Sequence, residues 1–218
     1  MGNTKQYIYS FEEAASLGPD KLGGKGASLV QMQAWGVTVP PGFIIITDAG
    51  RDLSKITFQE SEPFRAELGK QLSILEKKIQ QTTGLPVGFG DAKYPLLVSV
   101  RSGAPISMPG QMSTLLNVGL TEKSLDNTYY DPRLTAELYW RLYRTLIVAL
   151  GIERPRIQSL EEKYLSASGV SSPSNLPIET LKELANDFRV ELSNMHGKKF
   201  ADEFEKPETQ LWLAIKAV

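Results

Sequence analysis

The residue types with the clearest potential for chemistry lie near the start of the chain. Lys25 stands in the sequence Gly-Gly-Lys-Gly at 23–26, and apolar spacing after it predicts a helix over 26–35. Backbone N–H groups at a helix start, the positive helix end and an ammonium group would together attract an anion such as phosphate. The spacing matches neither a Walker loop nor a Rossmann fingerprint, so a surface turn with a solvated lysine is an equal alternative.

Arg101 is the second candidate. It directly follows 96–100, an apolar run that predicts a buried strand. A charge at the end of a buried strand must reach solvent or pair with an anion. The small neighbours Ser102 and Gly103 favour an anion, because a ligand can approach their backbone closely while the guanidinium grips phosphate oxygens. A salt bridge at the strand end is the alternative.

A third candidate is the segment 109–114, with the sequence Pro-Gly-Gln-Met-Ser-Thr. Its backbone amides and hydroxyls beside a glycine are typical of a loop that covers phosphate groups. Taken alone, the segment is better interpreted as a structural hairpin.

The remaining polar and aromatic clusters favour structural roles. His196 precedes Gly197 and two lysines, which indicates a histidine at the end of a helix rather than a catalyst. Tyr139, Trp140 and Tyr143 are interpreted as packing residues, because no excess of basic residues accompanies them. The pair Glu161 and Glu162 and the acidic cluster 202–208 are interpreted as solvated faces, because they lack the spacing of a metal site. We therefore expect no metal ligands in this sequence.

Composition excludes several classes of function. The chain has 218 residues, and its 24 basic and 25 acidic side chains give a net charge of −1, too balanced for sequence-independent binding of nucleic acid. It contains no cysteine and one histidine, which removes thiolate chemistry and multi-histidine metal sites. No window approaches a membrane span, and the polar start has no signal-peptide core. We expect a cytoplasmic protein with no membrane or nucleic-acid partner.

The elements that must position these candidates fall into two parts. Strands are predicted at 43–47, 96–100 and 114–118, and an amphipathic helix over 63–82. After Thr121 the pattern is helical: a helix over 132–150 carries the stripe Leu134, Leu138, Leu142 and Leu146. A second helix opens at 175–177 and buries Leu181, Leu184, Phe188 and Leu192. A third helical pattern runs from Pro207 to Val218 without a capping signal, so we expect the sequence to stop inside an element of a longer protein.

Three stretches together resemble the nucleotide-binding region of the pyruvate phosphate dikinase family. They are Leu22–Leu29, Val39–Phe43 and Leu97–Gly110, with sequences LGGKGASL, VPPGF and LVSVRSGAPISMPG, and their order and spacing agree with that family. Leu115–Leu120, the segment from Asp131 and the segment 210–218 extend the resemblance over nearly the whole chain.

The resemblance implies an α+β fold that forms the first part of an ATP-grasp-like domain with an all-helical insertion. It places the mixed α/β part at 1–120, the helical insertion at 121–206 and the start of a return helix at 207–218. Lys25 and Arg101 match the family's phosphate-contacting lysine and arginine and would be both catalytic and ATP-binding. Gly110, Met112 and Thr114 fall in the family's loop over the nucleotide, in which Gln111 and Ser113 replace the usual methionine and aspartate.

The resemblance also implies the reaction of the complete enzyme. ATP, phosphate and pyruvate become AMP, pyrophosphate and phosphoenolpyruvate through a phosphohistidine on a mobile domain. The cofactors would be ATP and Mg²⁺, with the metal-binding carboxylates outside this segment. Pyruvate, phosphoenolpyruvate and phosphate would be bound through domains absent from this sequence, and a homodimer of the full-length enzyme is compatible with the family. This chain alone is expected to be inactive.

Three alternatives stay open. The segment is also compatible with a phosphoenolpyruvate synthase-like protein or with an antibiotic-phosphorylating relative, which share the nucleotide module. The run SGAPISMPG and the long helical insertion favour the dikinase over the synthase. A non-catalytic module that senses nucleotide or mediates an interaction is the third alternative, which the residues at 111 and 113 allow and the retained Lys25 and Arg101 oppose.

Overall fold

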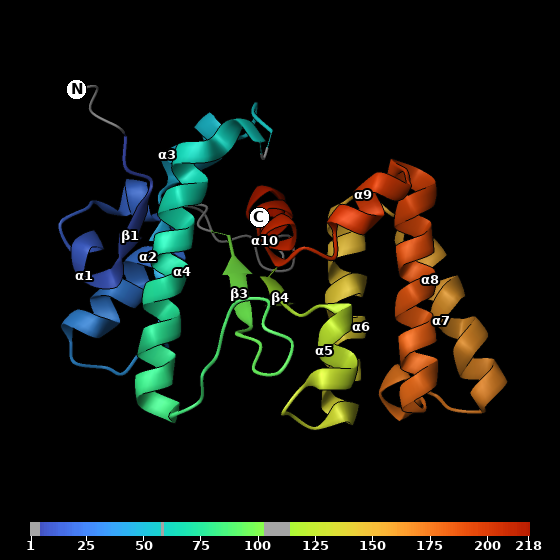
Figure 1. Cartoon of the computed structure of the whole chain (residues 1–218). Helices are drawn as coiled ribbons and strands as arrows, with labels where there is room; N and C mark the ends of the chain where they lie inside the picture. The colour runs from blue at the N-terminus through green and yellow to red at the C-terminus, as the bar shows by residue number, and fades with distance from the viewer. Residues whose placement is uncertain (1–4, 58, 103–113) are drawn as a thin grey trace. The chain divides into compact units, whose positions relative to one another are not determined.

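The computed structural model describes residues 5–57, 59–102 and 114–218 (Figure 1). Contacts divide these residues into two compact units. The first contains the described residues up to Pro86, with 101–102, Thr114 and Val218. The second contains Val87–Val100 and Leu115–Ala217.

The first unit is built around a short antiparallel strand pair. Strand β1 (Ile8–Ser10) pairs with β2 (Phe43–Ile45), with Ile8 opposite Ile45. Its helices are α1 (Phe11–Ala14), α2 (Pro19–Ala34), α3 (Thr47–Leu53) and α4 (Glu62–Thr83), with a 3₁₀ turn before α4 at Gln59–Ser61. Helix α1 follows β1 directly because Ser10 and Glu13 form a reciprocal capping box. Phe11, Ala14, Leu22 and Ile44 form a buried cluster that joins α1 and α2 to β2.

Helix α2 begins earlier than the sequence predicts. The glycines and the proline of 18–26 predict a loop. In the structure α2 instead starts at Pro19 and is kinked at Gly23, whose φ of 67° and ψ of 167° are not helical. The helix resumes beyond Gly23, so Gly24 and Lys25 are helical, and the helix predicted over 26–35 ends at Ala34. The loop prediction was wrong because a single glycine takes up the whole change of direction, which a positive φ permits.

The second unit contains most of a second strand pair, except Arg101 and Thr114, and the remaining helices. Strand β3 (Val98–Arg101) pairs with β4 (Thr114–Val118). After β4 come α5 (Glu122–Asn127), α6 (Pro132–Ala149), α7 (Arg154–Ser168), a 3₁₀ turn (Pro173–Asn175), α8 (Ile178–His196), α9 (Lys198–Glu203) and α10 (Pro207–Ala217). Helix α8 packs against α6, α7 and α9, as Figure 1 shows for this unit, while α5 and α10 contact α6.

The helices of the second unit share one core. The predicted face of α8 is confirmed, since Leu181, Leu184, Phe188 and Leu192 have no exposed surface. Helix α6 meets it with Leu142, Tyr143, Leu146 and Ile147, which are also fully buried. Asp131 caps α6 as predicted, accepting a hydrogen bond from the Leu134 N–H at 2.8 Å.

The predicted leucine stripe of α6 is only partly right. Leu134 is 50% exposed and Leu138 half-buried, whereas Tyr139, Trp140 and Tyr143 are buried, which confirms their interpretation as packing residues. Steps of four residues advance by roughly 400° around a helix with 3.6 residues per turn, so Leu134 lies about 120° away from Leu146. The face centred on Leu142 and Leu146 therefore takes in Tyr139 and Tyr143 and leaves Leu134 in solvent.

The predicted fold class is confirmed at the level of its elements. Strands and helices are mixed along the chain up to Val118, and every regular element described after it is a helix. The strand ends differ from expectation: Thr47 opens α3 rather than ending β2, and Leu96 and Leu97 precede β3. The ATP-grasp-like identity and the domain boundaries at 120 and 206 stay predictions. Within the described ranges, no helix is long and apolar enough to cross a membrane.

Candidate functional site

Lys25 lies on the exposed side of α2, in the first turn after the kink at Gly23. A helix that restarts after a break begins with backbone N–H groups that the preceding turn does not satisfy. The same turn is held in place on its other side, because Gly26 is buried and an added Cβ there would come within 3.3 Å of Ile44 Cδ1. Close packing of α2 on β2 therefore fixes the turn while the Lys25 side chain remains in solvent.

Arg101 is the last residue of β3 and is exposed. The prediction that it ends a buried strand was wrong, since Val98 and Val100 are half-buried and Ser99 is exposed. Strand β3 has one described partner, β4, and a two-stranded sheet cannot cover both faces of its strands. The guanidinium therefore reaches solvent without the cost of burying a charge.

Thr114 is the first residue of β4 and is half-buried. Arg101 and Thr114 thus flank the segment 102–113, which joins the two paired strands. The other predicted loop residues, Gly110 and Met112, lie outside the described residues, as do Gln111 and Ser113.

Within the described part of the chain, no hydrogen bond or ion pair involves the side chain of Lys25 or Arg101. Both cations are therefore uncommitted to a structural salt bridge there. The alternative of a strand-end salt bridge at Arg101 finds no partner among these residues.

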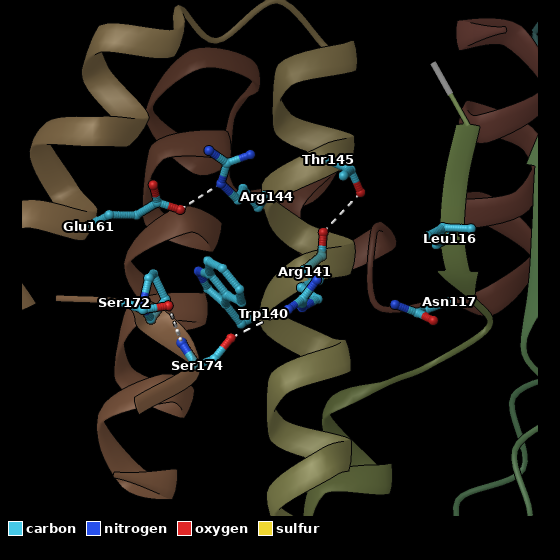
Figure 2. Close-up of a pocket in the computed structure, with 10 residues that line it drawn as sticks. Leu116, Asn117, Trp140, Arg141, Arg144, Thr145, Glu161, Ser172 and Ser174 are labelled. Carbon is cyan, nitrogen blue, oxygen red and sulfur yellow. Dashed lines mark hydrogen bonds and ion pairs between the residues drawn. The ribbon is translucent and has the colours of Figure 1, made fainter. Parts of the chain in front are cut away.

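A pocket of about 330 Å³ lies on the second unit, between β4, α6 and the segment 172–174 (Figure 2). Arg144 Nε donates to Glu161 Oε1 at 2.6 Å across it. Arg141 donates to Glu137 at 2.6 Å and to the Ser174 hydroxyl at 3.4 Å. Both arginines therefore already face a carboxylate, which favours a role in joining α6 to α7 and to the 172–174 segment.

Glu161 corrects one of the sequence interpretations. It was expected on a solvated face but is 8% exposed and paired with Arg144. Helix α7 offers few apolar positions, and only Ile157 and Glu161 are buried on it. The buried face of α7 therefore includes a charged residue, and the spacing of apolar residues in the sequence could not predict this.

Glu205 corrects the interpretation of the acidic cluster 202–208. Its carboxylate accepts hydrogen bonds from the hydroxyls of Tyr139, at 2.8 Å, and Tyr143, and from the backbone N–H of Glu122, at 2.9 Å. Burial raises the pKa of Glu205 above its ordinary value, and these hydrogen bonds offset part of that rise. Burial also raises the pKa of Tyr139, which keeps its hydroxyl protonated as a donor. A signal available in sequence was Phe204 beside Glu205, since an apolar neighbour in an acidic run indicates local burial.

The other polar groups fit structural roles. His196 ends α8, as predicted for a helix-end histidine, and its ring centroid lies 4.8 Å from that of Phe200, with the two rings tilted by 39°. Among the described residues, no group of three or more histidine, aspartate or glutamate side chains is arranged to hold a metal ion.

Comparison with known proteins identifies what the chain is related to. No protein-family profile matches it. It is 32% identical over 218 residues to pyruvate, phosphate dikinase of Clostridium symbiosum, covering 98% of this chain and 24% of that protein. It is 35% identical to the chloroplastic pyruvate, phosphate dikinase of Mesembryanthemum crystallinum, covering 90% of this chain and 20% of that protein. The enzyme of Entamoeba histolytica is 33% identical over 98% of this chain.

These matches confirm the resemblance to a class of phosphate-transferring enzymes. The chain is homologous to pyruvate, phosphate dikinase along almost its whole length. It spans about a quarter or less of the length of the curated relatives it matches.

Proposed function

We propose that this chain is the N-terminal ATP-binding part of a pyruvate phosphate dikinase-like phosphotransferase. The observation that carries the proposal is its homology to these enzymes over 98% of the chain. Lys25 and Arg101 stand in the motifs that resemble the family's phosphate-contacting segments. Substrates beyond ATP, namely phosphate and pyruvate or phosphoenolpyruvate, would be bound by parts of the complete enzyme outside this chain.

Lys25 and Arg101 would act on the phosphate groups of ATP. Both side chains are exposed cations with no ion-pair partner among the described residues, so neither must break a salt bridge before it binds an anion. Phosphoryl transfer places negative charge on the transferring oxygens, and fixed cations lower the barrier by stabilising that charge. The backbone N–H groups of the turn after Gly23 would orient the same phosphates.

Magnesium would accompany ATP, as the resemblance to the dikinases implies. It would supply charge neutralisation on the ATP phosphates, held by carboxylates elsewhere in the complete enzyme. The role proposed for Lys25 and Arg101 needs no metal ligand in this chain.

The single histidine is not proposed as the phosphorylated group. His196 is the last residue of α8, and its ring contacts that of Phe200 with 4.8 Å between the ring centroids. The phosphohistidine of the reaction would belong to another domain of the complete enzyme. The isolated chain is therefore expected to show no turnover with ATP, phosphate and pyruvate.

Isothermal titration of Mg-ATP into the chain tests the proposal. Lys25→Ala and Arg101→Ala should each weaken binding by about tenfold or more, the loss expected for a charge-assisted contact. Lys70→Ala on α4 and Arg154→Ala on α7 are matched controls, because both side chains are exposed, and these variants should bind as the parent does. Equal affinity in all five proteins would overturn the assignment of Lys25 and Arg101.

A further inference from the structure

The backbone between β4 and α5 is held by two side chains from the distant segment 205–210. The Gly119 N–H donates to Gln210 Oε1 at 3.1 Å, and Gln210 Nε2 donates to the Leu120 carbonyl at 3.0 Å. The Glu122 N–H donates to Glu205 Oε2 at 2.9 Å. Two side chains thus satisfy three backbone groups that lie 83 to 91 residues away in sequence.

Gln210 is an unusual choice for its place in the core. It is fully buried on α10, beside Leu211 and Trp212, where an apolar side chain would need no partners. A buried amide is tolerated because both of its ends are bonded to backbone groups that would otherwise be buried without partners. The Gln210 side chain therefore fills space in the core and also holds the backbone of 119–120 in one conformation.

Gly119 makes that conformation specific. Its φ is 107°, and an added Cβ would lie 2.7 Å from Phe89 and 2.8 Å from the Leu96 carbonyl oxygen. Two residues earlier, Asn117 has a φ of 62° and donates from its side chain to the Leu138 carbonyl at 3.4 Å. The end of β4 is therefore fixed against α6, α10 and the chain that leads into β3.

Holding the backbone at Gly119 and Leu120 also fixes the register of β4. Side chains alternate between the two faces of a strand, so a slip of one residue at Gly119 would turn every side chain of β4 to the opposite face. It would also move the start of the strand by about 3.3 Å. Thr114 begins β4, and Arg101 ends its partner β3.

We propose that Gln210 is a positioning residue for the nucleotide site: its two hydrogen bonds to Gly119 and Leu120 fix the register of β4 and so place Thr114 and Arg101. The inference rests on the proposed function for the role of those two residues in binding ATP. Gln210 itself touches no nucleotide.

Hydrogen exchange measured by mass spectrometry tests the register lock without any ligand. Gln210→Met keeps an unbranched side chain of similar length and removes both hydrogen bonds. Exchange of the backbone amides in 114–121 should rise by about tenfold or more, with 181–192 of α8 unchanged as the internal reference. Unchanged exchange in 114–121, or an equal rise in α8, would overturn the inference.

Mg-ATP affinity then tests the link to the nucleotide site. Gln210→Met should weaken binding by about tenfold. Tyr164→Phe, which removes a 2.8 Å hydrogen bond to Asp187 between α7 and α8, should leave it unchanged. If Gln210→Met loosens β4 but binds Mg-ATP like the parent, the positioning role is wrong and the proposed function stands. If the parent itself does not bind Mg-ATP, the proposed function fails for this chain and the positioning role fails with it, while the exchange data still decide the register lock.

Discussion

The hydroxyl of Tyr139 donates a 2.8 Å hydrogen bond to the carboxylate of Glu205, across 66 residues of sequence. The bond joins α6 to the turn between α9 and α10, and Tyr143 and the Glu122 N–H complete the shell of donors around the same carboxylate. A group buried in this way couples the stability of the helical unit to pH.

Because burial raises the pKa of Glu205, the folded chain holds this proton more tightly than the unfolded chain does. The stabilising contribution of Glu205 is therefore complete below the unfolded pKa of about 4.3 and is lost as pH rises through the folded pKa. Glu205→Gln removes this titration, so the parent should lose stability relative to the variant as pH rises from about 4 to about 8. Urea unfolding of both proteins across that range measures the difference. Glu162→Gln, at an exposed position of α7, is the control, and a difference for Glu205→Gln that is constant with pH would contradict the prediction.

Gly119→Ala should destabilise the chain by about 2–4 kcal/mol, because the new Cβ meets Phe89 and the Leu96 carbonyl at a positive φ. Gly69→Ala is the matched control on α4. Gly69 has an ordinary helical conformation with nothing within 4 Å of a new Cβ, so this variant should be more stable by up to about 1 kcal/mol. The denaturant midpoints of the two variants measure these changes in stability. A shift of both midpoints in the same direction would contradict the prediction.

Asp131→Ala should cost about 1 kcal/mol, because it removes the side-chain cap of α6 and leaves the Leu134 N–H without its acceptor. Asp126→Ala removes only an exposed ion pair with Lys182 and should cost less than about 0.5 kcal/mol. Thermal unfolding of the two variants compares them directly. An equal loss would mean that the Asp131 cap contributes no more than a surface ion pair.

Phe188→Ala should be the most destabilising of these changes, by about 3–5 kcal/mol, since Phe188 is fully buried in the α6–α8 core. Val190 lies two residues further along the same helix and is 47% exposed, so Val190→Ala should cost under about 1 kcal/mol. Unfolding of the two variants in urea provides the comparison. A small effect of Phe188→Ala would contradict the packing of this helix.

Sequence reasoning succeeded where local chemistry and periodicity agree with the tertiary environment. The α8 face was predictable because four apolar residues recur at helical spacing and all meet the core. The start of α6 was predictable because Asp131 and Pro132 are a good N-cap and first-turn residue. The resemblance to the dikinases rested on short motifs around Lys25 and Arg101, and homology over nearly the whole chain confirms it.

Interactions between residues far apart in the chain could not be predicted from the sequence. Glu161 is buried and paired with Arg144, and the half-buried Glu205 accepts hydrogen bonds from two tyrosines and a backbone N–H. Gln210 was noticed as part of a motif, but its bonds to Gly119 and Leu120 follow from a pairing across about ninety residues that no local pattern encodes. The roles of Lys25, Arg101, Gly110, Met112 and Thr114 in binding ATP stay predictions.

Chemical labelling of Lys25 in the presence of Mg-ATP tests the central claim most directly. The chain is acetylated with an amine-reactive ester with and without saturating Mg-ATP, and each lysine is quantified by peptide mass spectrometry. Lys70, exposed on α4, is the internal reference, and adenosine with magnesium controls for binding that involves no phosphate. We expect Mg-ATP to protect Lys25 while adenosine does not, with Lys70 labelled equally throughout. Equal labelling of Lys25 under all three conditions would contradict the proposal that its ammonium group binds the phosphates of ATP.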